Sequence, residues 1–221
     1  MPQRRHLTRK SNLWLAEALW KLGAVQFGSF TLGRTTVDSP VYINLRLLIG
    51  HPTALWRAAS IIWEEIQALQ SMLHPQMERC DLVAGVPFGG LHVATAFSLH
   101  AKIPMVYLHP RPDSLGNDIE GLYHPNDRVL IMDDLLAGGG SILETALQLG
   151  EAGLIVRDAV VLLDRQQGGR EALRRQGINM VSILTLEVLM NYLMSSGKIS
   201  EDSYRRTMAF LEAHSHLEEE P

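Results

Sequence analysis

The stretch VLIMDDLLAGGGSILETA, from Val129 to Ala146, constrains the fold of this chain more than any other part of it. Its first four residues are apolar and predict a short buried strand, and the residues from Ser141 onward have the apolar spacing of an amphipathic helix. Two carboxylates and three consecutive glycines lie between these elements. Consecutive glycines destabilise a fold unless something must approach the backbone closely, so a purely structural turn is the less favoured explanation. The stretch therefore predicts a strand–loop–helix unit that binds a ligand.

The rest of the chain repeats this alternation of apolar strands and amphipathic helices. Hydrophobic spacing predicts helices over residues 11–22, 51–73, 88–101 and 141–152. It predicts strands over residues 27–32, 39–46, 81–86, 104–108, 129–132, 158–163 and 180–184. Residues 109–121 contain turn-forming residues without periodicity and predict a long loop, and the C-terminal part predicts helices. This alternation is typical of an α/β fold with right-handed crossovers and a mostly parallel sheet.

Length and composition narrow the class of protein. The 221 residues suffice for one domain with a sizeable core, and 46% hydrophobic with 20% charged residues is typical of a globular protein. A net charge of -4 without a basic cluster argues against nucleic acid as a partner, and no apolar run approaches the roughly 18 residues of a membrane span. The basic start MPQRRHLTRK lacks the apolar core of a secretory signal. Because the single cysteine, Cys80, also suits a reducing compartment, we expect a cytoplasmic protein.

Three clusters of glycine or acidic residues follow predicted strands. They are GVPFGG over residues 85–90, DDLLAGGG over residues 133–140 and DRQQGG over residues 164–169. Ligands of open α/β sheets bind beyond the carboxyl ends of the strands, which all lie at one edge of a parallel sheet. The three clusters are therefore expected to form one composite site.

The acids and the glycines suit opposite ends of a phosphoribosyl group. A glycine turn that enters a helix presents backbone N–H groups and the positive end of the helix dipole to a phosphate, and Ser141 adds a hydroxyl donor. Asp133 and Asp134 would repel that phosphate, but carboxylates accept hydrogen bonds from the 2′- and 3′-hydroxyls of a ribose. The spacing therefore predicts acids on the sugar and glycines on its 5′-phosphate.

Other phosphate-binding motifs fit less well. A Walker loop requires a lysine after its glycines, where this chain has Ser141, and GVPFGG lacks the spacing of the dinucleotide-binding fingerprint. The acidic pair of a phosphoacceptor receiver domain is not followed by a triple glycine.

Several collinear motifs resemble those of a known family. VLIMDDLLAGGGS resembles the phosphoribosyl pyrophosphate (PRPP) signature of type I phosphoribosyltransferases. Residues 25–187 are similar to orotate phosphoribosyltransferase, particularly the orotate domain of bifunctional UMP synthase, through FGSFTL, SPVYINLR, VAGVPFGGLHVAT, IPM, IEG and AGLIVRDAVVLLDRQQGG. The resemblance implies the type I phosphoribosyltransferase fold: a central mostly parallel sheet flanked by helices, with a small N-terminal hood. The hood would span residues 1–50, the PRPP-binding core 51–187 and the C-terminal helices 188–221 of a single domain.

The resemblance also implies roles for individual residues. The catalytic residues would be Asp133, Asp134 and Arg111. The PRPP-binding residues would be Phe88, Gly89, Asp133, Asp134, Ala137, Gly138, Gly139, Gly140 and Ser141. The orotate-binding residues would be Tyr42, Ile43, Arg165 and Arg34, with the Arg165 guanidinium on the orotate carboxylate. The cofactor Mg²⁺ would be carried by PRPP and not by a dedicated set of protein ligands, and the chain would form a homodimer.

Three positions depart from the pattern of the family. The family's mobile loop has an arginine and several lysines that reach the pyrophosphate of the neighbouring subunit, whereas LHPRPDSLGNDIEG has only Arg111, together with Asp113 and Asp118. The signature usually has a threonine at the position of Ala137. Arg34 stands near the place of a family lysine, shifted by one residue.

Three functions are compatible with this sequence. The first is transfer of the phosphoribosyl group from PRPP to orotate, which Arg165, SPVYIN and DRQQGG favour because these features are specific to orotate enzymes. The second is a catalytically degenerate paralogue that binds PRPP or a nucleotide in a regulatory role, which the lysine-free loop favours. The third is phosphoribosyl transfer to another base.

Overall fold

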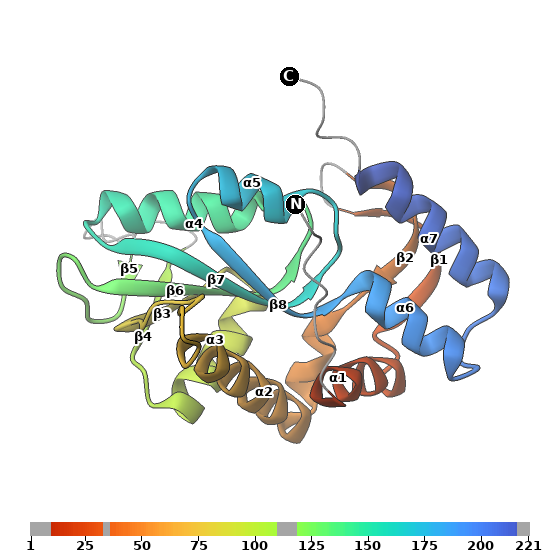
Figure 1. Ribbon diagram of the computed structural model, residues 1–221, viewed down its shortest axis with the longest axis horizontal. Helices are drawn as coiled ribbons and strands as arrows, with labels where there is room; N and C mark the ends of the chain where they lie inside the picture. Colours follow the sequence, from red (N-terminus) through yellow and green to blue (C-terminus); the bar gives the residue numbers. More distant parts are fainter. Residues whose placement is uncertain (1–9, 33–35, 110–118, 216–221) are drawn as a thin grey trace.

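The computed structural model describes residues 10–32, 36–109 and 119–215, and its centre is a six-stranded sheet (Figure 1). Its strands are β3 (Leu82–Gly85), β4 (Met105–Leu108), β5 (Ile119–Glu120), β6 (Arg128–Leu136), β7 (Ile155–Asp164) and β8 (Asn179–Thr185). Their order is β5-β4-β3-β6-β7-β8, and all neighbours are parallel except β4 and β5. The predicted α/β class with a mostly parallel sheet is confirmed.

Helices cover both faces of this sheet, and each face has its own core (Figure 1). The helices of one face are α2 (Pro52–Gln70) and α3 (Gly89–Ala101), and those of the other are α4 (Gly140–Glu151) and α5 (Gly169–Arg175). Successive side chains of β6 alternate between the two cores: Leu130 and Met132 pack with the α2 and α3 side, whereas Val129 and Ile131 pack with the α4 and α5 side. This alternation follows from the two-residue repeat of a strand and explains why residues 129–132 of β6 are all apolar.

The remaining elements gather beside β8 (Figure 1). They are α1 (Lys10–Lys21), the antiparallel hairpin of β1 (Val25–Leu32) and β2 (Thr36–Ile43), the 3₁₀-helix η1 (Leu45–Gly50), α6 (Leu186–Ser195) and α7 (Glu201–Ser215). α1 contacts α6, and α7 packs against β2. The proposed boundaries at residues 50 and 187 remain predictions; α6 begins directly after β8, at Leu186.

Several elements differ from their predicted bounds, and two of these differences lie close to the predicted site. The predicted strand over residues 129–132 continues to Leu136, because β7 pairs with β6 as far as Asp164 beside Leu136. The acidic pair therefore lies within the strand and not after it. The predicted strand over residues 39–46 ends at Ile43, where η1 begins two residues later.

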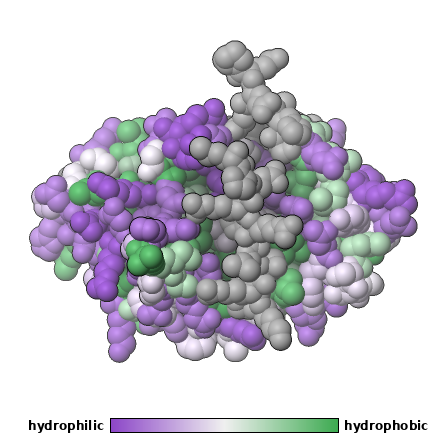
Figure 2. Space-filling view, in the orientation of Figure 1, coloured by the Kyte–Doolittle hydropathy of each residue, from purple (hydrophilic) through white to green (hydrophobic). Residues whose placement is uncertain are grey.

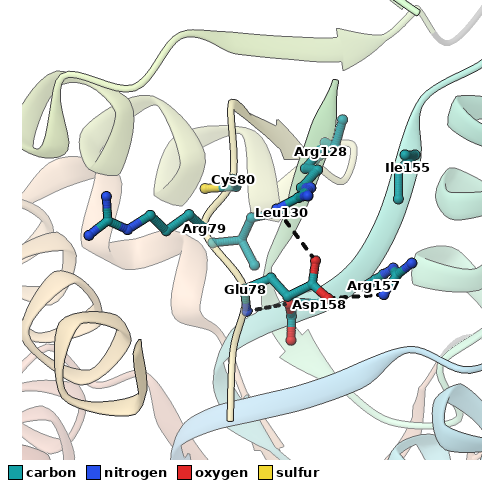
Figure 3. A pocket seen from close by; sticks show the side chains of 9 residues that line it. Glu78, Arg79, Cys80, Arg128, Leu130, Ile155, Arg157 and Asp158 are labelled. Carbon is teal, nitrogen blue, oxygen red and sulfur yellow. Dashed lines mark hydrogen bonds and ion pairs between the residues drawn. The ribbon is translucent and has the colours of Figure 1, made fainter. Parts of the chain in front are cut away.

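A charged cleft of about 510 Å³ lies at the amino ends of the strands, the edge opposite to the one where ligands of such sheets bind. The Glu78 carboxylate lies 2.9 Å from Arg157 and 3.8 Å from Arg128, and the Asp158 carboxylate accepts a hydrogen bond from the Glu78 backbone N–H at 3.2 Å. Arg79 points away from this group (Figure 3). Most of the charge here is thus used to attach the connection between α2 and β3 to the sheet.

The face of the molecule in Figure 2 shows hydrophobic residues scattered among hydrophilic ones. Within the described ranges, no helix is both long and apolar enough to span a membrane.

Candidate active site

The order of the strands reverses its direction across the sheet between the neighbouring strands β3 and β6. The chain continues from β3 through α3 to β4 on one side, and from β6 through α4 to β7 on the other, so the two helices diverge from neighbouring strands. Such a switch point is where open α/β sheets bind their ligands. Gly85 pairs with Met132, and Leu136 pairs with Asp164, so all three predicted clusters lie at this edge, as their positions in the sequence indicate.

Glycines at the start of α3 let this helix approach the acidic pair. A Cβ on Gly89 would collide with the Asp134 carboxylate, and a Cβ on Gly90 would collide with the Met132 carbonyl oxygen. Phe88, which precedes them after a cis peptide bond from Pro87, is 66% exposed. The glycines of GVPFGG are thus required by close packing of α3 on β6, and they bring the predicted pyrophosphate loop next to the predicted ribose-binding acids.

Asp133 is held in a position that disfavours its negative charge. Its side chain is 8% exposed, and its Oδ1 accepts a hydrogen bond from the Asp134 backbone N–H at 2.8 Å. Burial, and then repulsion by the adjacent Asp134 carboxylate, raise the pKa of Asp133 well above its usual range. Hydroxyl groups of a ribose would donate hydrogen bonds to this pair and stabilise its ionised form, so the electrostatics suit the role predicted for the two acids.

The Asp133→Asn variant is expected to be more stable without ligand than the native chain. An acid whose pKa is raised by folding binds more protons in the folded state, so the free energy of unfolding falls as the pH rises above the ordinary carboxyl range. At pH 8 the variant should therefore be the more stable of the two proteins, because asparagine carries no charge that burial opposes. Near pH 4 the gain should shrink toward zero.

Urea unfolding of both proteins across this pH range measures the difference. Asp202→Asn, on the exposed surface of α7, serves as the control because it should show no comparable gain. A variant that is equally stable at both pH values, or less stable at pH 8, would contradict the raised pKa.

The glycine loop leaves the start of α4 open to a ligand. Gly139 has φ +83°, a conformation that favours glycine, and no side chain caps the helix. Ideal Cβ atoms on Gly138 and Gly140 would meet nothing within 4 Å, so open space lies beside both residues. The N–H groups of the first turn of a helix have no intrahelical partners. A phosphate bound between Ala137 and Ser141 would satisfy them.

Arg165 is a buried cation that no carboxylate among the described residues pairs with. Its side chain is 3% exposed, and its Nη2 donates a hydrogen bond to the Ser39 hydroxyl at 2.9 Å, while its Nε has no hydrogen-bond partner among the described residues. Burial lowers the pKa of Arg165 to about 10, so the guanidinium remains charged at neutral pH. Buried charges are normally paired, and a carboxylate ligand would supply the missing pairing.

The other residues predicted to bind the base are placed less completely. The Tyr42 hydroxyl accepts a hydrogen bond from Arg46 at 3.2 Å, and the Tyr42 ring lies 5.7 Å from that of Phe30. The Ile43 side chain is part of the hydrophobic core, which leaves its backbone for any contact with a base. Arg34 and Arg111 lie outside the described residues.

Two residues of the site were missed by sequence reasoning. Ser39 contacts Arg165 although the two residues are 126 positions apart in the chain. The one signal in the sequence was the position of Ser39 directly before the proline of SPVY. Gly169 donates a backbone hydrogen bond to the Ala137 carbonyl oxygen at 2.9 Å, and thus supports the glycine loop from below. The second glycine of DRQQGG was the signal for this contact.

Comparison with known proteins identifies the family of this fold and site. No model of a known protein family matches the chain. It is 38% identical to orotate phosphoribosyltransferase of Chlamydia caviae over 83% of this chain and 86% of that protein. The solved structure of Leishmania donovani UMP synthase matches 94% of this chain and 43% of its own chain, with a TM-score of 0.83 and 30% identity.

A second solved structure, orotate phosphoribosyltransferase from Aeropyrum pernix, matches 83% of this chain and 99% of its own, with a TM-score of 0.68 and 34% identity. The sequence relative and the two structural neighbours each cover at least 83% of this chain. The chain belongs to the orotate phosphoribosyltransferase family.

Proposed function

We propose that this protein transfers the phosphoribosyl group of PRPP to orotate, giving orotidine 5′-phosphate and pyrophosphate, a step of UMP and pyrimidine nucleotide synthesis. The family supports this reaction, and so does one observation of the site. The buried Arg165 cation, whose side chain has the Ser39 hydroxyl as its one hydrogen-bond partner in the described ranges, lies at the same edge of the sheet as the acidic pair and the glycine loop. The carboxylate of orotate would pair with this guanidinium, because arginine binds carboxylates through two parallel hydrogen bonds.

The residues of the site divide the work of this reaction. The loop from Ala137 to Ser141 binds the 5′-phosphate, Asp133 and Asp134 bind the ribose hydroxyls, and Phe88 and Gly89 line the pyrophosphate. The ring nitrogen N1 of orotate loses its proton to solvent and forms a bond to C1′ of the ribose. The bond from C1′ to the pyrophosphate oxygen breaks at the same time, and pyrophosphate leaves. The ribose becomes cationic at this stage, and preorganised carboxylates stabilise such charge.

Mg²⁺ is the cofactor we propose, bound together with PRPP. Its hard-cation chemistry suits the pyrophosphate and hydroxyl oxygens of PRPP, which would carry the ion into the site. The part of the chain that the structure describes has no group of three or more histidine, cysteine, aspartate or glutamate side chains placed to hold a metal ion. When bound, the ion would neutralise charge on the pyrophosphate.

A regulatory paralogue that binds PRPP without turnover is the second candidate. The observation that favours it is the composition of residues 109–121, where Arg111 is the one arginine or lysine and Asp113 and Asp118 add negative charge. A positioned cation is typically worth about 10²–10³ in rate when charge develops on a leaving group. Transfer to another base is the third candidate, and the buried Arg165, which no described carboxylate pairs with, argues against bases that lack a carboxylate.

A panel of bases separates the three candidates. The purified chain is incubated with PRPP, Mg²⁺ and either orotate, uracil or adenine, and nucleotide products are separated by chromatography. Product from orotate alone supports the proposal, because uracil differs from orotate only in lacking the carboxylate. Product from adenine or uracil but not orotate supports another base. A rise in melting temperature with PRPP and no product from any base supports the regulatory paralogue.

We also propose a homodimer, located in the cytoplasm. Exposed apolar side chains on α2 and α3, Trp56 at 57% and Leu99 at 78%, offer surface for contact with a second copy. The single cysteine suits a reducing compartment. Sedimentation at micromolar concentration should give about twice the mass of the 24.7 kDa chain. A monomer at that concentration would contradict the dimer.

A further inference from the structure

We infer that Arg170 is a positioning residue that couples the orotate subsite to the phosphate loop, an inference that rests on the proposed function. The segment concerned is the connection from β7 to α5, residues 165–168, named here the base turn. It contains Arg165, and α5 begins directly after it at Gly169. The contacts of this turn join the two halves of the site.

Backbone hydrogen bonds join the base turn and the residue after it to the end of β6 and to the phosphate loop, residues 137–141. The Arg165 backbone N–H donates to the Leu136 carbonyl at 2.8 Å, and the Gly169 N–H donates to the Ala137 carbonyl at 2.9 Å. A Cβ on Gly169 would collide with the same carbonyl and lie 2.9 Å from the Gly139 backbone nitrogen. A displacement of the base turn by a few tenths of an ångström would therefore move the loop that binds the phosphate.

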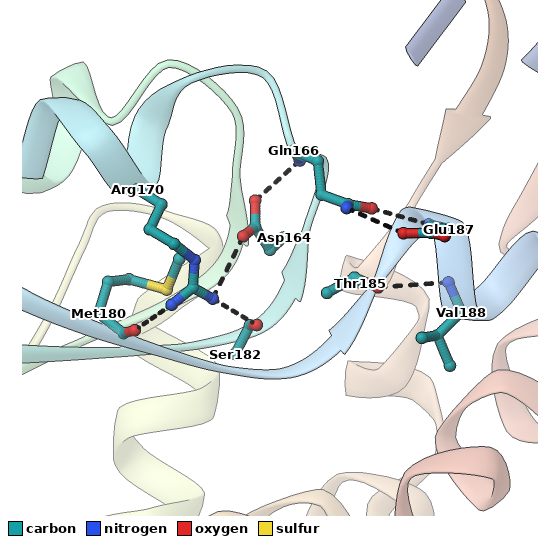
Figure 4. Close-up of polar contacts among 8 residues, drawn as sticks. All are labelled: Asp164, Gln166, Arg170, Met180, Ser182, Thr185, Glu187 and Val188. Atoms are coloured by element: carbon teal, nitrogen blue, oxygen red, sulfur yellow. Dashed lines mark hydrogen bonds and ion pairs between the residues drawn. The ribbon is translucent and has the colours of Figure 1, made fainter. Parts of the chain in front are cut away.

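Arg170 holds the base turn through Asp164 (Figure 4). Asp164 is 2% exposed; its Oδ1 accepts the Gln166 backbone N–H at 2.8 Å, and its Oδ2 lies 3.4 Å from Arg170 Nη2. Arg170 in turn donates to the Met180 carbonyl at 2.7 Å and to the Ser182 hydroxyl at 3.0 Å, both on β8. The planar guanidinium thus connects a buried carboxylate with two fixed acceptors, an arrangement that a lysine cannot reproduce.

Gln166 fixes the turn on its third side. It has φ +58°, a backbone conformation uncommon for a residue other than glycine, and its N–H is the one bound by Asp164. Its side-chain oxygen accepts the Glu187 backbone N–H at 2.9 Å, and its amide nitrogen lies 3.4 Å from the Glu187 carboxylate (Figure 4). The base turn is therefore attached to β6, to β8 and to the start of α6. Its residues consequently move together when any one of them is displaced.

The consequence is an energetic link between the two subsites. An orotate carboxylate that binds Arg165 positions the base turn, and the turn positions Ala137 and Gly139 for the phosphate. By reciprocity, a bound phosphate raises the affinity for orotate by the same factor, and such coupling is typically about 5- to 150-fold. Without Arg170, orotate and phosphate should bind nearly independently.

Calorimetry with a non-reacting pair of ligands tests this coupling. Ribose 5-phosphate occupies the sugar and phosphate positions but lacks the pyrophosphate, so it cannot react with orotate. The dissociation constant of orotate is measured with and without saturating ribose 5-phosphate. In the native chain, orotate should bind at least about fivefold more tightly in its presence, the lower end of typical coupling. In Arg170→Met the factor should fall below about two, and Arg170→Lys should give an intermediate value.

The matched control is Arg174→Met on the same helix. Arg174 pairs with Glu171 and its side chain is 74% exposed, so its removal should leave the coupling unchanged. Equal coupling in the native chain and in Arg170→Met, or no coupling in the native chain, would overturn the inference. If Arg170→Met does not fold, an unchanged coupling factor in Arg170→Lys would overturn it instead. Failure of the native chain to bind either ligand would contradict the proposed function and not this coupling alone.

Discussion

Replacing Arg165 with methionine is expected to lower kcat/KM for orotate by about 1000-fold or more, because a substrate carboxylate then meets an apolar side chain in a buried site. Arg165→Lys should recover only part of this loss, since an ammonium group cannot form two parallel hydrogen bonds to a carboxylate. Binding of PRPP, measured by calorimetry with Mg²⁺ and without orotate, should change less than threefold in either variant. Steady-state kinetics with varied orotate measure the first effect.

The Arg165→Met variant should be more stable than the native chain in the absence of ligand. The native guanidinium is buried and bonds to the Ser39 hydroxyl, and burial lowers its pKa to about 10. Its charge is therefore retained at neutral pH without a carboxylate partner in the part of the chain that the structure describes. Methionine removes this charge and fills a similar volume. Arg205→Met on exposed α7 is the control for both measurements. Unchanged orotate kinetics in Arg165→Met would remove the main support for orotate as the base.

The second large effect is expected for Gly89→Ala. The added Cβ would occupy the position of the Asp134 carboxylate, so this side chain must move away from the ribose. A misplacement of about 1 Å at a catalytic group can cost about 100-fold in rate. We therefore expect kcat/KM for PRPP to fall by about 100-fold, similar to Asp134→Asn, although no charge is removed.

Gly150→Ala is the control, because it tests whether any glycine-to-alanine change in a helix lowers activity. A Cβ on Gly150, near the end of α4, would meet nothing within 4 Å, so this variant should keep full activity. Combining Gly89→Ala with Asp134→Asn should add little to either change alone, because both act on the same carboxylate. Full activity of Gly89→Ala, or independent effects in the double variant, would contradict the placement of Asp134 over Gly89.

Local patterns in the sequence predict most of the sheet and much of the site. The class of fold follows from the alternation of strands and helices, and the acids and glycines of residues 133–140 indicate a phosphoribosyl ligand from their chemistry alone. The extension of β6 through Asp134 could not be predicted, because it depends on pairing with β7 and not on the residues of β6.

The support for the site is also non-local. Ser39 reaches Arg165 from a hairpin far away in the sequence, and the need for glycine at positions 89 and 169 arises from backbone atoms of β6 and of the phosphate loop. Hydrophobic periodicity and turn preferences describe neighbouring residues, so they cannot predict such long-range contacts. Arg34 and Arg111 stay predictions, because both lie outside the described residues.

The most direct test of phosphoribosyl transfer to orotate is the loss of orotate absorbance on addition of PRPP and Mg²⁺ to the purified protein. Phosphoribosyl transfer predicts a steady loss, matched by orotidine 5′-phosphate and pyrophosphate in equal amounts, that is about 100-fold slower in Asp134→Asn. No loss at micromolar enzyme, with a PRPP-dependent rise in melting temperature, would contradict the enzymatic function and leave a binding protein.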